Sequence, residues 1–213
     1  MKTALVWLAV LLFGAVLLVT TNYQSRDPDS ALYARLSADL SRRPAWQWIA
    51  PEWGGAWNQQ GLFREHPVGI LLPSALAARA GFPAAQAAYA VNMAYQAAVI
   101  LLLPVVAALV MRHADARALA WVLQLLPVSF VYRIRGNQEH PLLLCFLALI
   151  YATHRSRSHP AWIALMTVAF CWLALIKGAF AMFALVAAAL WIVCVPSPRD
   201  RNNRLGRPAG CAT

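Results

Sequence analysis

The sequence predicts an all-α, polytopic membrane protein with about six transmembrane helices and a long first outer loop that carries an amphipathic surface helix. Of its 213 residues, 61% are hydrophobic and only 12% are charged. An average soluble domain has about 45–50% apolar and about 25% charged residues, so this composition excludes a soluble globular protein and a disordered one. The net charge of +10 then indicates basic cytoplasmic loops, and no nucleic-acid partner is expected.

The N-terminal segment is the first predicted membrane helix. Lys2 precedes a continuous apolar run from Ala4 to Val19. A cleaved signal peptide is the alternative, but the residues that follow Val19 offer no small-x-small cleavage site. We therefore expect an uncleaved anchor whose N-terminus lies inside the cell.

A polar stretch from Asn22 to His66 follows, and it is rich in tryptophan, a residue that favours the headgroup level of a bilayer. Within it, Asp29–Arg42 is predicted to form an amphipathic helix, because leucines recur every four residues on one face and charged residues occupy the other. Such a helix is expected to lie on the membrane surface. The leucines are Leu32, Leu36 and Leu40, and the tryptophans are Trp46, Trp48, Trp53 and Trp57.

The short apolar segment Pro67–Ala80 decides the predicted topology. It falls short of the roughly 20 residues that a spanning helix needs. If it only dips into the bilayer, the arginine-rich loops that follow all face the cytoplasm, as the positive-inside rule favours. The predicted membrane domain is therefore 1–195, with an outer loop at about 22–83 and a disordered basic cytoplasmic tail at 196–213. The other predicted spans are Ala84–Met111, Leu119–Tyr132, Pro141–Thr153, Ala161–Ile176 and Ala179–Val195.

Candidate site residues lie in the predicted outer loop and outer turns. Asp29, at the start of the amphipathic helix, is predicted to be a helix cap, and Asp29 or Asp27 is a candidate general base at the membrane surface. One carboxylate can do both. Glu139 and His140 must enter the helix that follows them, because the apolar run alone is too short to span. This places two ionisable groups at or below headgroup depth, where such groups usually face a cavity or a partner. The alternative is an ordinary helix start capped by Asn137.

Basic residues on the same side suggest a phosphate partner. Arg133 and Arg135 lie on an outer turn, against the charge bias, and binding of a phosphate would explain them. Gly178 must turn the chain, because the apolar run from Ala161 to Val195 is too long for one helix across a bilayer. Lys177 beside it is either an anion-binding group or a lysine that snorkels from a hairpin tip. No cysteine spacing indicates zinc or a disulfide framework, and no cofactor is expected.

The polar stretches around Asp29, Arg64, Arg135 and Lys177, taken together, resemble motifs of the membrane glycosyltransferases of the C superfamily. The types they resemble most are protein O-mannosyltransferases and bacterial lipid A aminoarabinose transferases. The stretch from Pro28 to Ala34 resembles the family's acidic pair and Tyr-Ala step, with Asp29 on the catalytic aspartate and Ser30 where the family usually has Glu. Residues 135–141 resemble its Arg-Asn-x-x-Asp-x-Pro turn, with Glu139 in place of Asp. Residues 66–82 resemble the exit of its outer loop, and residues 175–178 resemble its Thr-Lys-Gly step.

The resemblance implies transfer of a sugar, with inversion, from a polyprenyl-phosphate donor to an acceptor outside the cytoplasmic (inner) membrane of a bacterium. Asp29 would take the proton of the acceptor hydroxyl, and Glu139 would help to orient the acceptor or Asp29. The residues expected to hold the phosphate are Arg64, His66, Arg135 and Lys177.

Members of that family are longer, so the sequence is expected to be a truncated one. The alternatives are a non-catalytic membrane protein, as a remnant or a partner subunit, and a small transporter. Transporters tend to place ionisable residues near mid-bilayer and to carry paired repeats, whereas here the polar groups gather at one face and no repeat is visible. The expected partners are the lipid-linked sugar donor and membrane lipid. The sequence identifies neither the sugar nor the acceptor.

Overall fold

The computed structural model describes residues 28–55, 59–64, 68–125, 136 and 138–195. These residues form α-helices and short 3-10 helices and contain no β-strand, which confirms the all-α prediction. The predicted first span, Ala4–Val19, and the tail from residue 196 lie outside the described residues. The elements are α2 (Pro28–Arg42), η1 (Ala45–Ile49), η3 (Val68–Ile70), α3 (Leu71–Arg79), α4 (Ala84–Ala107), α5 (His113–Leu125), α7 (Glu139–Ser156), α8 (Trp162–Lys177) and α9 (Phe180–Cys194).

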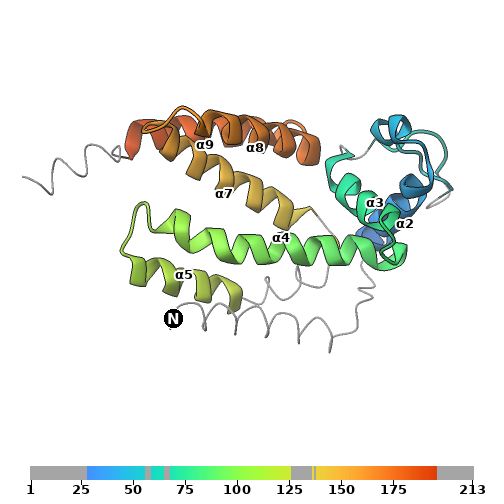
Figure 1. The fold of residues 1–213 in the computed structure, drawn as a ribbon, viewed down its shortest axis with the longest axis horizontal. Helices are drawn as coiled ribbons and strands as arrows, with labels where there is room; N and C mark the ends of the chain where they lie inside the picture. The colour runs from blue at the N-terminus through green and yellow to red at the C-terminus, as the bar shows by residue number, and fades with distance from the viewer. Residues whose placement is uncertain (1–27, 56–58, 65–67, 126–135, 137, 196–213) are drawn as a thin grey trace, which may run out of the picture.

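The helices form two parts that lie end to end (Figure 1). The long helices α4, α7, α8 and α9 run lengthwise, with α5 beside α4, and we call this part the bundle. The residues from Pro28 to Arg79 pack together at one end of the bundle, and we call them the terminal subdomain. Within the bundle α7 contacts α4, α8 and α9, while α2 and α3 contact each other and α4. The start of α4 therefore joins the two parts.

Most helix bounds in the bundle agree with the sequence prediction. The chain turns between α8 and α9 at Gly178, which has φ 54° and ψ −119°, a conformation open to glycine and strained for other residues. The helix α7 includes Glu139 and His140, as predicted, and continues to Ser156. The prediction for α5 was wrong at its start, because the helix begins at His113 rather than Leu119. Its polar first turn is stabilised by Asp115, which pairs with Arg112 at 2.8 Å.

The lengths of the helices can be compared with the length that each of the six predicted membrane spans needs. Among the described residues only Gln86–Ala107, within α4, is long and apolar enough to cross a membrane. The helices α8 and α9 are apolar but have 16 and 15 residues. The segment that was predicted to dip, Pro67–Ala80, contains η3 and the nine-residue α3, which is far too short to span.

The leucine stripe of α2 packs on protein. The amphipathic helix is confirmed, but an amphipathic helix on a membrane surface buries its apolar face in lipid. Here Leu32, Leu36 and Leu40 are 1–4% exposed and lie in the core of the terminal subdomain. The leucine face of α2 is therefore covered by protein, because α3 and the loop aromatics pack on it, and the location of this helix at a membrane surface stays a prediction.

Two of the predicted headgroup tryptophans also lie in that core. Trp48 and Trp53 are both buried, and the Trp53 ring meets Phe63 edge to face with a centroid distance of 4.9 Å. Trp46 is exposed, and Trp57 lies outside the described residues. Tryptophan count alone therefore overstated the contact of this loop with lipid.

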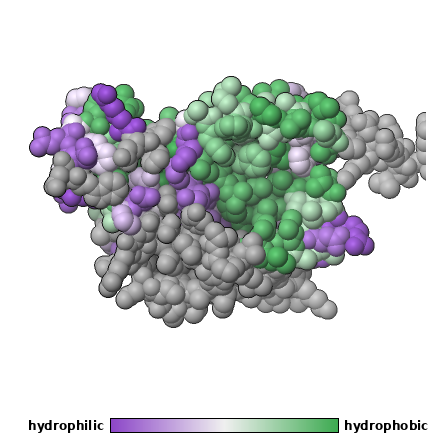
Figure 2. All heavy atoms as spheres, turned by 180° about the vertical axis from the view of Figure 1, so that it is seen from behind, coloured by the Kyte–Doolittle hydropathy of each residue, from purple (hydrophilic) through white to green (hydrophobic). Residues whose placement is uncertain are grey.

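The helix α9 has small residues inside and large apolar residues outside. Ala181, Ala184 and Ala188 are buried against α7 and α8, whereas Phe183 and Val193 are 70% and 82% exposed. Figure 2 shows apolar side chains gathered over the bundle and hydrophilic ones over the terminal subdomain. A soluble domain would bury the large side chains of such a helix, so this pattern is inverted relative to a soluble core.

We predict that the small stripe of α9 sets the spacing between α9 and its neighbours. Replacing Ala184 with Leu forces extra volume into a helix interface and should lower the free energy of unfolding by about 1–3 kcal/mol. The matched change Val186→Leu, on the exposed face, should stay within about 0.5 kcal/mol of the parent protein. Unfolding in detergent micelles, followed by circular dichroism, measures both. Equal stability of the two variants would contradict the packing described for α9.

Candidate functional site

The start of α2 is joined to Gly136, three residues before α7, by a buried hydrogen bond. The backbone N–H of Gly136 donates to Oγ of Ser30 at 3.0 Å, across 106 positions of sequence. Ser30 is fully buried, and so is its neighbourhood on the inner face of α2. Asp29 and Glu139 lie one and three residues from the two bonded groups, so the contact brings together the two segments that carry the predicted catalytic carboxylates.

Close backbone packing supports this junction at two glycines. A Cβ at Gly136 would lie 3.3 Å from Cβ of Ala88, so this glycine rests directly on the first half of α4. A Cβ at Gly69 would lie 2.6 Å from the backbone carbonyl of Leu175, so η3 touches the end of α8 without room for a side chain. Lys177 follows two residues after Leu175. The stretches around Asp29, Glu139 and Lys177 thus lie at the same end of the bundle.

The first turn of α7 carries two ionisable side chains, Glu139 and His140, and His140 contacts α4. Nδ1 of His140 lies 3.2 Å from Oδ1 of Asn92, an α4 residue that is 3% exposed. Since an amide oxygen can only accept, the donor in a hydrogen bond at this contact is the Nδ1–H of His140. Glu139 is half-buried, and its Oε2 has no solvent contact. The buried carboxylate at the positive end of α7 is stabilised by the helix dipole.

A small polar cavity lies where α2, α3, α4 and Gly136 meet. It has an accessible volume of about 10 Å³, which is room for one water molecule. A cavity of this size cannot hold a sugar. Its lining residues are Tyr33, Ile70, Ser74, Ala88, Val91, Asn92, Tyr95, Gly136 and Pro141.

The sequence prediction missed the polar face of α4. Asn92 and Gln96 lie four residues apart, so they share one face of the helix, and both are at most 4% exposed. The side-chain amide of Gln96, Nε2, has no hydrogen-bond partner among the described residues. Two buried amides inside an apolar run from Ala84 to Met111 were the available signal, because polar groups at membrane depth usually mark a functional site.

The predicted site residues have different surroundings in the structure. Asp29 is exposed in the first turn of α2, inside the helix rather than ahead of it. Lys177, the last residue of α8, is half-buried. Arg64 is exposed, and no described hydrogen bond or ion pair joins it to the other predicted residues. His66 and Arg135 lie outside the described residues, as does the predicted cap Asn137.

This arrangement gives two carboxylates two different environments. Asp29 is exposed to water, whereas Glu139 is half-buried, with its Oε2 shielded from solvent. Within the described residues no three His, Cys, Asp or Glu side chains come close enough to hold a metal ion.

We predict that Ser30 is required to hold the junction. Ser30→Ala removes the acceptor and leaves the buried Gly136 N–H without it, which should destabilise the fold by about 1–3 kcal/mol. Ser37→Ala is the matched control on the same helix, because Oγ of Ser37 is buried without a hydrogen-bond partner among the described residues. That variant should be neutral or slightly more stable. Unfolding in detergent compares them, and a neutral Ser30→Ala would contradict the role of the bond.

Comparison with protein-family models, with curated proteins and with solved structures found no match for this chain. The likeness of its motifs to the C-superfamily glycosyltransferases therefore stays a prediction from the sequence. The function is argued below from the geometry of the chain itself.

Proposed function

We propose that the chain is a multi-pass membrane protein whose bundle spans the bilayer. The inverted pattern of α9 supports this placement, and Val168 of α8 is 64% exposed in the same way. In lipid, large apolar side chains are solvated by acyl chains, and small residues let helix backbones approach closely. In water the same face would be a large exposed apolar patch, which soluble monomers rarely carry.

The charge of the short loops supports an orientation. The end of the bundle opposite the terminal subdomain carries Arg155 in the last turn of α7 and Arg112 and Arg157 in the loops (Figure 1). By the positive-inside rule this end faces the cytoplasm, so the terminal subdomain lies outside. The helices α8 and α9 extend about 24 and 23 Å, which is short of the roughly 30 Å core, and a locally thinned bilayer accommodates them.

For its activity, we propose transfer of a sugar from a polyprenyl-phosphate donor to an acceptor on the outer face of the membrane. The observation that supports this most is the hydrogen bond between Ser30 and Gly136, which holds the segments of Asp29 and Glu139 at one end of the bundle. A lipid-linked donor presents its reactive carbon at headgroup depth, where this end of the bundle would lie. Two carboxylates and a nearby lysine are the groups that such a reaction needs.

The solvent exposure of Asp29, Glu139 and Lys177 supports a different role for each of them in the proposed reaction. Asp29 is open to solvent and serves as the general base that takes the proton of the acceptor hydroxyl as its oxygen attacks the anomeric carbon. Glu139, fixed in the first turn of α7, orients the acceptor or Asp29. Lys177 stabilises the phosphate that leaves, because a charge-assisted bond is strong in a partly buried site. Since the cavity is too small for a sugar, the donor binds on the exposed side of the junction or opens it.

The change Asp29→Asn tests this proposal. Asn keeps the shape of the side chain but cannot accept the proton, so sugar transfer should fall about 10²-fold or more. Asp115→Asn is the matched control, because Asp115 also lies in the first turn of a helix but at the opposite end of the bundle. It should leave transfer unchanged.

The measurement is transfer of labelled sugar from polyprenyl-phosphate donors in membranes that hold the full chain. Equal transfer by Asp29→Asn and the parent protein would show that the carboxylate is not a base. Absence of transfer by the parent protein with every donor class would contradict the enzymatic proposal and favour a non-catalytic membrane protein.

A further inference from the structure

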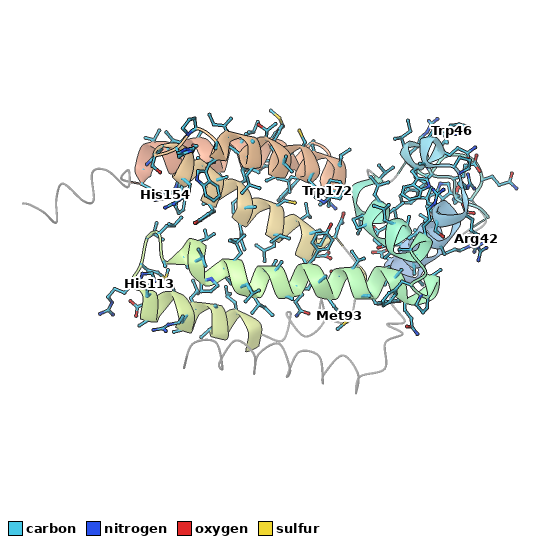
Figure 3. All side chains as sticks on the ribbon, viewed as in Figure 1. Arg42, Trp46, Met93, His113, His154 and Trp172 are labelled. Carbon is cyan, nitrogen blue, oxygen red and sulfur yellow. The ribbon has the colours of Figure 1, made fainter. Side chains whose placement is uncertain are left out.

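The short helix η1 presents two large apolar side chains to solvent. In a 3-10 helix residues three positions apart lie above one another, so Trp46 and Ile49 form one ridge. Their exposed fractions are 73% and 79%. We call this pair the η1 ridge. It lies on the terminal subdomain, beyond the end of α8 (Figure 3).

The fold holds the η1 ridge in this exposed position. Trp48, on the opposite side of η1, is 7% exposed, and its Nε1 donates to the backbone oxygen of Arg43 at 3.2 Å. The guanidinium of Arg43 pairs in turn with Asp39 at 2.7 Å and Glu52 at 3.0 Å. Burial tends to lower the pKa of Arg43, but its hydrogen bond to Glu52 and the nearby charges outweigh this effect and raise the pKa above its ordinary value. The ridge is thus anchored from behind by a packed tryptophan and an ion-pair network.

The surroundings of the ridge combine apolar and basic groups. The guanidinium of Arg79 lies 5.7 Å from the ring centroid of Trp48, so this face of α3 is beside η1. Leu76, one turn earlier on that face, is 57% exposed. Arg42 is exposed at the end of α2, just before η1 (Figure 3). Exposed tryptophan and aliphatic side chains flanked by arginines match the interface of a membrane, where tryptophan prefers the headgroup level and arginine pairs with lipid phosphates.

We propose that the η1 ridge inserts into the outer headgroup region of the bilayer that holds the bundle, with Arg42 and Arg79 beside it on anionic lipid headgroups. This inference rests on the proposed membrane placement of the bundle. It assigns membrane contact to Trp46 and Ile49, while the leucine stripe of α2 serves the core. Such an anchor would fix the terminal subdomain, and with it Asp29, at a constant depth relative to a lipid-linked substrate.

Site-directed spin labelling tests the proposal on the full chain in lipid nanodiscs that contain anionic and zwitterionic phospholipid. The native cysteines are replaced, and a nitroxide is attached singly at Ile49→Cys, Val186→Cys or Gln60→Cys. Val186 reports the outer face of α9, and Gln60 is an exposed polar position of the terminal subdomain. Collision with oxygen indicates lipid, and collision with a water-soluble nickel complex indicates water.

The expected result is that the label at Ile49 collides more with oxygen and several-fold less with nickel than the label at Gln60, at a shallower depth than Val186. In a second variant, Arg42→Gln with Arg79→Gln should raise the nickel accessibility at Ile49. If Ile49 behaves like Gln60 while Val186 lies in lipid, the anchor is wrong and the membrane placement stands. If Val186 is also in water, both are wrong. A label at Ile49 that is shielded from both reagents shows a protein partner on the ridge and overturns the lipid assignment.

Discussion

The buried hydrogen bond from Gly136 to Ser30 is the constraint on which the rest of the arrangement depends. A buried backbone N–H must find an acceptor, and here the acceptor comes from a helix 106 positions earlier in the chain. This requirement holds the start of α2 against Gly136, and Gly136 also packs on Ala88 of α4. The direct approach of Gly69 to Leu175 adds the end of α8 to the same junction. Five separate stretches of the sequence thus share one end of the bundle.

The two parts of the molecule differ in which side chains they bury and which they expose. The terminal subdomain buries leucines and tryptophans in a core, as a soluble domain does. The bundle buries alanines along α9 and leaves larger side chains such as Phe183 outside, which is favourable only where the surroundings are apolar. The proposed site lies where these two parts meet, and a substrate with a polar head and a lipid tail has the same dual character. This shared character supports the proposed lipid-linked substrate.

The sequence was informative wherever a local pattern decides structure. The period of the α2 leucines predicted the helix, and the length of the last apolar run required a turn at Gly178. It was uninformative wherever tertiary contacts decide. The leucine period is the same whether lipid or α3 covers it, and nothing local distinguishes the buried Trp48 from the exposed Trp46. For the site, the stretches around Asp29 and Glu139 were predicted, but Asn92 and the role of Ser30 depend on which helices pack together.

Hydrogen exchange at the amide of Gly136 tests the central claim most directly, because that amide forms the contact itself. The account predicts that this N–H exchanges slowly in the parent protein in detergent or nanodiscs, faster by at least about tenfold in Ser30→Ala, and unchanged in Ser37→Ala. Exchange of the Gly136 amide at the rate of an unprotected peptide in the parent protein would contradict the account, since it would mean that the two segments are not joined.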